Sequence, residues 1–249
     1  GKGEWTILYH SGALRGRNEP MKLLFEDAQV PYTCSDEKLY GPEGWMDAFA
    51  GSPENAKKER GVYPLFFPPA VWHKPPGGEE VMINQVFSVM QYIGDTLPGY
   101  APGSVVERAR MSHIAMNALD LWGEGRNSFH PVDLSASYST QKDEALVSSK
   151  KFAAGRLLIW LEFFEKLVKR AGEGKPVAGG ANVTMADFVL LQVLLAVEAQ
   201  FNNESYDMAW DKCDVPALKA FKKSMEERPN VKGYLRSDRC STFAGDSMM

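Results

Sequence analysis

The chain has 249 residues, a net charge of −4 and an isoelectric point near 5.7, which argues against nucleic acid or an anionic membrane as its main partner. Apolar residues make up 44% and charged residues 24% of the sequence, as in a soluble globular protein of one large domain or two small ones. No apolar run reaches the ~18 residues of a membrane span, and the N-terminus lacks the apolar core of a secretion signal.

The N-terminal part of the chain predicts alternating strands and helices. The β-branched and aromatic segment Trp5–His10 is typical of a first strand. Residues 21–29 have the spacing of an amphipathic helix, and Pro31–Cys34 begins a second strand. The segment from Ser35 to Gly61 is polar and rich in glycine and proline, which predicts a long loop with a short helix around Trp45–Phe49.

Two adjacent prolines, Pro68 and Pro69, interrupt the next apolar run. Proline fixes φ and removes a hydrogen-bond donor, so this run is not expected to form a central strand. The pattern instead predicts a short strand from Pro69, a turn at Gly77–Gly78 and a returning strand at 81–83. A helix is expected to start near Gln85, with first-turn N–H groups able to hold an anion. The resulting order, β-α-β-(α)-β-β-α, fits several α/β sandwiches.

A segment rich in proline and glycine, residues 96–103, reads as a linker. No strand pattern follows it, and Ser104 with Glu107 forms a capping-box signature at the start of a long helix. The sequence therefore predicts a mixed α/β domain over residues 1–97 and an all-helical domain over residues 104–249.

Three further helices are expected in this second part. One begins at Thr140 and ends at Gly172, and the last covers Pro216–Glu227. Between them, Thr184 and Asp187 have capping-box spacing before an almost wholly apolar run. Because a helix that is apolar on all sides must be surrounded by protein, this run predicts the central helix of the domain.

Taken together, these features resemble the cytosolic glutathione transferases, and most closely their sigma-type group, which has microbial members. The resemblance is carried by Tyr9, Gly16-Arg17-Asn18-Glu19, Pro68-Pro69-Ala70, His130-Pro131, Gln141-Lys142-Asp143-Glu144-Ala145 and Val183-Thr184-Met185-Ala186-Asp187, which occur in the family's order. It implies a thioredoxin-like domain followed by an all-helical domain. It also implies a cytoplasmic homodimer that uses glutathione as co-substrate and conjugates its thiolate to an apolar electrophile.

The resemblance places Tyr9 where the family has the donor to the glutathione sulfur. A free thiol titrates near pH ~8.5, and a donor aimed at the sulfur stabilises the thiolate. Packing under the sheet is the alternative role for Tyr9. Because the loop after Tyr9 is longer than usual, Ser11 is a rival donor.

The resemblance also assigns a set of residues to glutathione binding. Pro69, preceded by Pro68, fits the family's cis-proline, and Gln85 fits a polar contact to the γ-glutamyl end. The guanidinium groups of Arg15 or Arg17 suit carboxylates, and the Trp45 indole resembles the donor to the glycine carboxylate. A surface role for the arginines and a structural role for Trp45 remain open.

Val86 departs from the family pattern, which has a serine or threonine hydroxyl at this position. The backbone N–H remains, but a hydrogen bond to a charged group is worth about 1.5–3 kcal/mol. This loss leaves a second interpretation open, in which the chain is a non-catalytic carrier or assembly subunit with a degraded glutathione site. A glutathione-dependent isomerase or dehalogenase is a third.

Candidates for a second-substrate pocket lie on the first helix of the helical part: Met111, His113, Met116 and Trp122. Helical stripes of this kind more often belong to the core. No Cys-x-x-Cys, phosphate loop or metal-ligand spacing occurs in the sequence, so thioredoxin-type redox chemistry and a metal site are not expected. The three cysteines, Cys34, Cys213 and Cys240, are widely spaced, which favours a reducing compartment.

Overall fold

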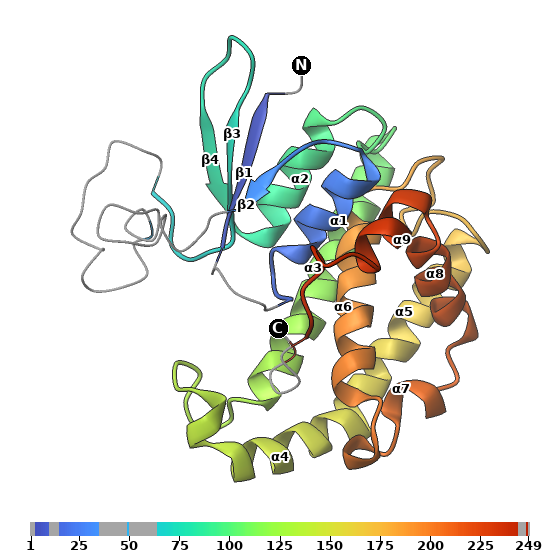
Figure 1. The fold of residues 1–249 in the computed structure, drawn as a ribbon. Helices are drawn as coiled ribbons and strands as arrows, with labels where there is room; N and C mark the ends of the chain where they lie inside the picture. The colour runs from blue at the N-terminus through green and yellow to red at the C-terminus, as the bar shows by residue number, and fades with distance from the viewer. Residues whose placement is uncertain (1–2, 10–14, 35–48, 50–63, 244–247, 249) are drawn as a thin grey trace.

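A four-stranded sheet with two helices beside it stands next to a larger group of helices in the computed structural model (Figure 1). The structure describes residues 3–9, 15–34, 49, 64–243 and 248. This is the expected architecture, a thioredoxin-like part followed by a helical part. Among the described elements, no helix is both long and apolar enough to cross a membrane.

The sheet has the strand order β2-β1-β3-β4. Strand β1 (Glu4–Leu8) pairs in parallel with β2 (Thr33–Cys34) and antiparallel with β3 (Ala70–Lys74), which in turn pairs antiparallel with β4 (Val81–Asn84). All four predicted strands are present. The expectation that the apolar run with the two prolines would not form a central strand is wrong for its last residues, because both prolines precede β3, which lies between β1 and β4. Gly77 in the hairpin turn has a φ of +71°, a conformation that favours glycine. The predicted short helix around Trp45 falls outside the described residues.

The two faces of the sheet pack against different groups of residues. Trp5, Ile7 and Val71 belong to the main core, on the side where α1 (Glu19–Asp27) and α2 (Val86–Thr96) lie. Leu8 and Ala70 point the other way and form a second, small core with Met82, Phe49 and Leu65. This division follows from the alternation of side chains along a strand. It fixes the register and therefore the positions of the residues that follow each strand.

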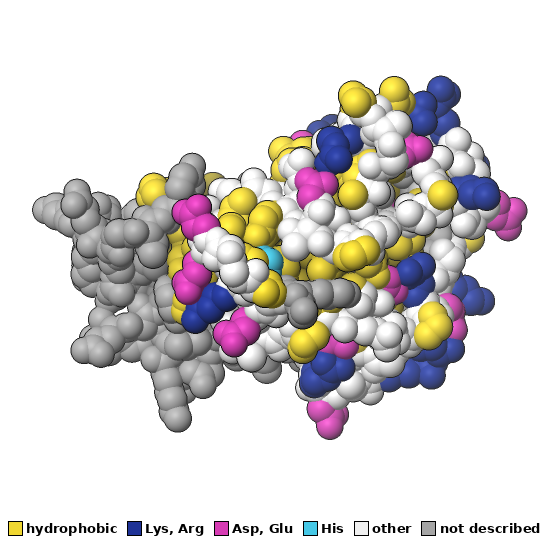
Figure 2. Space-filling model, turned by 90° about the horizontal axis from the view of Figure 1, so that it is seen from above, with side chains coloured by type: hydrophobic (Ala, Val, Ile, Leu, Met, Phe, Trp, Pro, Cys, Tyr) yellow, Lys and Arg dark blue, Asp and Glu magenta, His cyan; other side chains and the backbone are white. Residues whose placement is uncertain are grey.

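The helical part contains α3 (Val105–Ser128), α4 (Lys142–Lys151), α5 (Leu157–Ala171), α6 (Met185–Phe201), α7 (Ala209–Lys212), α8 (Pro216–Glu226) and α9 (Pro229–Leu235). Helix α6 runs through its centre (Figure 1), and every residue from Met185 to Val197 is buried. The prediction of a central apolar helix is confirmed. On the upper face, basic and acidic side chains are interspersed over these helices (Figure 2).

The predicted caps are present, with small differences. The Ser104 hydroxyl accepts the Glu107 N–H, but the Glu107 carboxylate accepts the N–H of Gly103. The helix predicted from Thr140 is divided: a 3₁₀ turn (Tyr138–Thr140) precedes α4, and a π-helical segment (Phe152–Arg156) joins α4 to α5. The sequence did not indicate α7, because four residues carry too little periodicity to reveal a helix.

Candidate functional site

The strand register brings Tyr9, Pro69 and Gln85 to one edge of the sheet. Ala70 of β3 pairs with Leu8 of β1 on one side and with Asn84 of β4 on the other. Tyr9 directly follows Leu8, Pro69 directly precedes Ala70, and Gln85 directly follows Asn84. Three residues that lie far apart in the sequence are therefore neighbours in the fold, as the family resemblance implies.

The phenol of Tyr9 is held against the start of α1. Its Oη accepts the Arg17 backbone N–H at 3.3 Å. A Cβ added at Gly16 would lie 2.5 Å from this Oη, so only glycine allows the ring to approach so closely. Burial raises the pKa of the Tyr9 phenol, against smaller lowering effects of the Arg17 N–H and the charges of Arg17 and Arg126. Tyr9 is therefore a protonated donor at neutral pH.

The other side of this edge carries the start of α2. The Pro68–Pro69 bond is cis, in agreement with the family resemblance. Gln85 is exposed and precedes α2 with a φ of +71°, in a region that glutamine rarely adopts. No side chain caps α2, so the first N–H groups of this helix have no partner within the helix. Positive φ in a non-glycine residue is often found at functional sites.

Val86, the first residue of α2, is 4% exposed and belongs to the main core. We expect Val86→Thr, which replaces a methyl by a hydroxyl in the same shape, to tighten glutathione binding roughly ten- to a hundredfold. The buried hydroxyl should destabilise the fold by about 1–3 kcal/mol. Titration calorimetry with glutathione, together with urea unfolding, measures both effects. Unchanged glutathione affinity would show that Val86 does not face the ligand.

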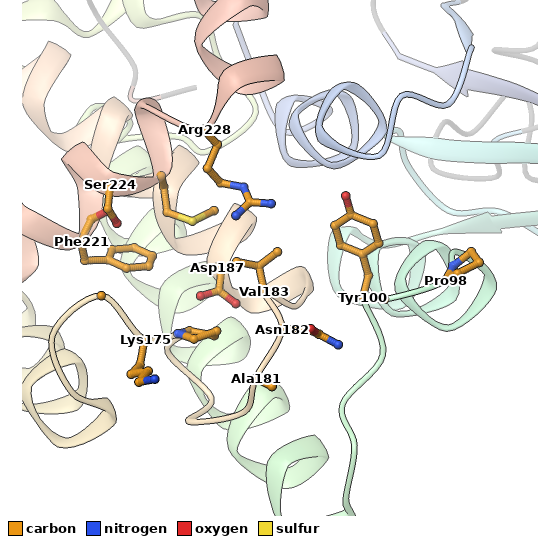
Figure 3. Close-up of a pocket in the computed structure, with 14 residues that line it drawn as sticks. Pro98, Tyr100, Lys175, Ala181, Asn182, Val183, Asp187, Phe221, Ser224 and Arg228 are labelled. Carbon is orange, nitrogen blue, oxygen red and sulfur yellow. The ribbon is translucent and has the colours of Figure 1, made fainter.

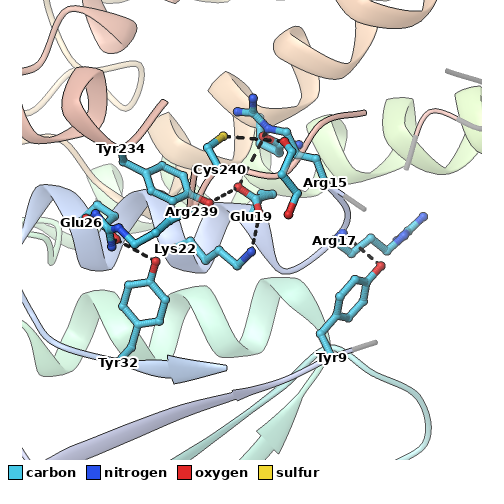
Figure 4. Close-up of polar contacts among 12 residues, drawn as sticks. Tyr9, Arg15, Arg17, Glu19, Lys22, Glu26, Tyr32, Tyr234, Arg239 and Cys240 are labelled. Atoms are coloured by element: carbon cyan, nitrogen blue, oxygen red, sulfur yellow. Dashed lines mark hydrogen bonds and ion pairs between the residues drawn. The ribbon is translucent and has the colours of Figure 1, made fainter. Parts of the chain in front are cut away.

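The two arginines after the first strand point in different directions (Figure 4). Arg15 is 7% exposed, and its Nε donates to Gln192 Oε1 at 3.2 Å. The Arg15 backbone N–H also donates to Thr242, and its guanidinium lies 4.7 Å from the Phe243 ring centre. This arrangement favours a structural role for Arg15. Arg17, by contrast, lies on the Tyr9 side, and its guanidinium stands 5.5 Å from the Trp122 ring centre.

Glu19 joins the first turn of α1 to the helical part. This fully buried carboxylate accepts the Lys22 ammonium at 2.7 Å and the Tyr234 hydroxyl at 2.7 Å, and Arg15 Nε lies 3.9 Å away. Burial and the Glu19 charge raise the pKa of Tyr234. Two cations and a phenol thus share one carboxylate in the interior (Figure 4), which fixes the loop that carries Arg17.

The C-terminal end of the chain lies beside the same region. The Trp122 indole N–H donates to the carbonyl of Met248, which is fully buried. A Cβ at Gly125 would lie 2.0 Å from the Met248 sulfur, so α3 accepts this residue only at a glycine. The Trp122 ring therefore has Arg17 on one side and a hydrogen bond to the end of the chain.

The predicted second-substrate residues do not lie together. Met111 is 1% exposed and packs in the core, whereas Met116 is 46% exposed. His113 lines a cavity of about 450 Å³ with Arg110 and Arg170. At 1.5 Å per residue, Met111 is roughly 16 Å along α3 from Trp122. Trp122 lies against Arg17, which follows Tyr9 in the sequence, and its role in substrate binding stays a prediction, as do those of the other three.

Two predicted residues, the rival donor Ser11 and the indole of Trp45, lie outside the described residues, and their roles stay predictions. Arg126, one helical turn after Trp122, was not singled out in the sequence. The only sequence feature that points to Arg126 is its i, i+4 spacing from Trp122. This spacing becomes informative only when Trp122 is known to contact Arg17. Among the described residues, no three His, Cys, Asp or Glu side chains gather as metal ligands.

A cavity of about 500 Å³ lies away from the Tyr9 edge, between the 98–100 segment, the loop before α6 and α8 (Figure 3). Its main polar groups already have partners. Arg228 and Tyr100 both bind the Asp27 carboxylate, and Asp187 accepts the N–H groups of Val177 and Thr184. We therefore assign these groups to holding the helices together.

Comparison with known proteins gives the same class as the fold. Residues 126–238 match the family model described as "Glutathione S-transferase, C-terminal domain". The chain is 25% identical over 229 residues to glutathione S-transferase P 1 of Xenopus laevis, covering 90% of this chain and 89% of that protein. It is also 25% identical over 241 residues to the class-mu 26 kDa isozyme 7 of Fasciola hepatica, covering 95% and 88%.

Solved structures agree on the architecture. The sigma class glutathione transferase of Fasciola hepatica superposes with a TM-score of 0.69 at 18% identity, over 97% of this chain and 99% of that chain. The pi-class enzyme of Onchocerca volvulus gives 0.62 at 18% identity, over 93% and 91%. The fold is that of a thioredoxin-like domain joined to a helical domain. The family model, the curated relatives and the solved structures together support membership of the cytosolic glutathione transferase superfamily.

Proposed function

We propose that the chain is a glutathione transferase that conjugates the glutathione thiolate to an apolar electrophile. The observation that carries this proposal is the convergence of Tyr9, Pro69 and Gln85 at one edge of the sheet, set by the pairing of Ala70 with Leu8 and Asn84. The proposal draws glutathione as co-substrate from the relatives, which are named glutathione S-transferases.

The site residues have distinct roles in this proposal. The γ-glutamyl carboxylate of glutathione binds at the start of α2, where the unpaired N–H groups and the helix dipole favour an anion. The backbone beside Pro69 holds the cysteine, and Tyr9 donates its phenolic hydrogen to the sulfur. The thiol proton leaves to solvent, and the sulfur lone pair forms a bond to the electrophilic carbon as the leaving group departs with its electron pair.

Tyr9→Phe tests this mechanism, because it removes the donor and keeps the ring. We expect kcat/KM at neutral pH to fall roughly ten- to a hundredfold, while retention on immobilised glutathione persists. Loss of the donor raises the pKa of the bound thiol toward its ordinary value of ~8.5, so the residual activity should rise with pH over a more alkaline range. Chlorodinitrobenzene is the assay electrophile. Unchanged activity and pH profile would exclude Tyr9 as the donor and direct attention to Ser11.

Val86 gives specific support to a second candidate, a non-catalytic carrier or assembly subunit. Its side chain packs in the core and offers no hydroxyl to the γ-glutamyl group. A well-folded protein that is not retained on immobilised glutathione would favour this function over the transferase.

We also propose, from the family resemblance, that two copies of the chain form a dimer in the cytoplasm, with the two domains meeting between residues 97 and 104. Phe66 and Phe67, just before the cis-proline, are 60% and 53% exposed, and exposed apolar patches are often interaction sites. Sedimentation equilibrium measures the oligomeric state.

A further inference from the structure

Although burial raises the pKa of the Tyr9 phenol, the positive charges of Arg17 and Arg126 both act on this phenol and favour a lower pKa. Arg17 stands over the Trp122 ring, at 5.5 Å from its centre. Arg126 lies four residues after Trp122 on α3, which puts both on one face of the helix. The Arg126 Nη2 donates to the Leu134 carbonyl at 3.2 Å, which holds the side chain in place. Arg126 is half-buried and belongs to helix α3 of the helical part, whereas Arg17 lies between the first strand and α1.

Within the described part of the chain, no carboxylate balances the positive charge at this place. Among the described residues, no Asp or Glu carboxylate forms an ion pair with Arg17 or Arg126. Among the described residues, Glu19 is an acidic group that acts on Tyr9, and it already binds Lys22 and Tyr234. Burial and the neighbouring Arg126 lower the pKa of Arg17, as expected for cations that lack a counter-charge.

The proposed reaction supplies one negative charge here, that of the sulfur. Counted over the described residues, two guanidinium groups and one thiolate leave one positive charge without a partner. A partly buried charge without a partner is unfavourable, and a guanidinium group suits a carboxylate in a two-bond arrangement. A second anion at this place would therefore bind favourably.

We propose that the second substrate is an electrophile that carries a carboxylate, and that Arg126 binds this carboxylate beside the reacting sulfur. This inference rests on the proposed transferase function and names the substrate class that the site selects. Arg126 is in this role a specificity-determining residue, whereas Tyr9 and Arg17 act on glutathione itself.

The test compares two electrophiles with the same reaction, chlorodinitrobenzene and its ring-carboxylated analogue chlorodinitrobenzoate, in wild type and in Arg126→Gln. We expect kcat/KM for the benzoate to fall roughly ten- to a hundredfold in the variant, and kcat/KM for the neutral compound to fall much less, because Tyr9 and Arg17 still stabilise the sulfur. The wild-type preference for the benzoate should weaken as salt is added. Arg110→Gln is the matched control, because Arg110 lies on the same helix and lines a different cavity. It should not change kcat/KM for either electrophile.

An equal loss for both electrophiles in Arg126→Gln, or no loss for either, would overturn the inference and leave the transferase function standing. If wild type turns over neither compound, the proposed function fails. The inference about Arg126 is then tested by equilibrium binding of the two S-aryl glutathione conjugates that correspond to the two electrophiles. Arg126→Gln must then still weaken the carboxylated conjugate selectively, as measured by titration calorimetry. Equal affinities for the two conjugates in wild type would overturn it.

Discussion

Glu19→Gln is expected to destabilise the protein by about 3–5 kcal/mol. The substitution keeps the size of the side chain but removes the charge that compensates Lys22 and Arg15, both 7% exposed. It also places an amide N–H₂ group opposite donors, since the Lys22 ammonium and the Tyr234 hydroxyl both point at the Glu19 oxygens. Breaking a buried ion pair by removing one partner leaves an uncompensated charge in the interior. Urea unfolding at neutral pH, followed by tryptophan fluorescence, measures this change.

The control is Glu26→Gln on the same helix. Glu26 pairs with Arg239, whose side chain is 62% exposed, and accepts the Tyr32 hydroxyl. The Glu26 side chain is 13% exposed, but its partner Arg239 stays hydrated when the pair is broken, so this variant should lose less stability than Glu19→Gln. Similar losses in both variants would mean that burial of the Glu19 network contributes nothing beyond a surface pair.

Asp187→Ala should have an effect of similar size, about 3–5 kcal/mol. The carboxylate is fully buried and accepts the Val177 N–H at 2.9 Å, the Thr184 N–H at 2.7 Å and the Thr184 hydroxyl at 3.0 Å. Alanine leaves two buried N–H groups unsatisfied, each at about 1–3 kcal/mol. The loop before α6 is attached through Val177, so hydrogen exchange at this N–H should speed up as global stability falls.

Thr184→Val separates the two parts of this cap. It removes the hydroxyl and keeps both backbone bonds to Asp187, so the expected loss is only about 0.5–2 kcal/mol. If Asp187→Ala and Thr184→Val prove equally destabilising, the backbone bonds of Asp187 carry no measurable share of the stability. Comparing m-values in urea shows whether either variant alters the cooperativity of unfolding.

Most of the fold could be predicted from local patterns. Three local patterns each predict one structure: the start of a strand after Pro68 and Pro69, a hairpin turn at Gly77–Gly78, and a helix cap at Thr184 and Asp187. The structure has the corresponding strand, turn and cap. The interruption between α4 and α5 was not visible, because the apolar spacing continues across the π-helical segment at 152–156. The division into domains at 97 and 104 and the assignment of the site residues remain predictions.

The candidate site was less predictable, because its residues are selected by partners far away in the chain. Arg15 and Arg17 flank Gly16 and look equivalent in the sequence. In the fold, Arg15 donates a hydrogen bond to Gln192 of α6, whereas the Arg17 guanidinium packs over the Trp122 ring of α3. Neither Gln192 nor Trp122 can be inferred from residue spacing, because each lies far from the two arginines in the sequence and on another helix. For the same reason the sequence did not show that Trp122, rather than another of the four α3 candidates, would lie against Arg17.

The Glu19 network also bears on how members of this superfamily can be recombined. Its carboxylate and Arg15 come from the first part of the chain, whereas Gln192 and Tyr234 come from the helical part. A chimera that joins residues 1–97 of this chain to the helices of a relative inherits only one side of these contacts. Such an exchange succeeds only when the donor of the helices also supplies an amide and a phenol at the matching places, so compatible parents can be chosen by inspecting these few positions.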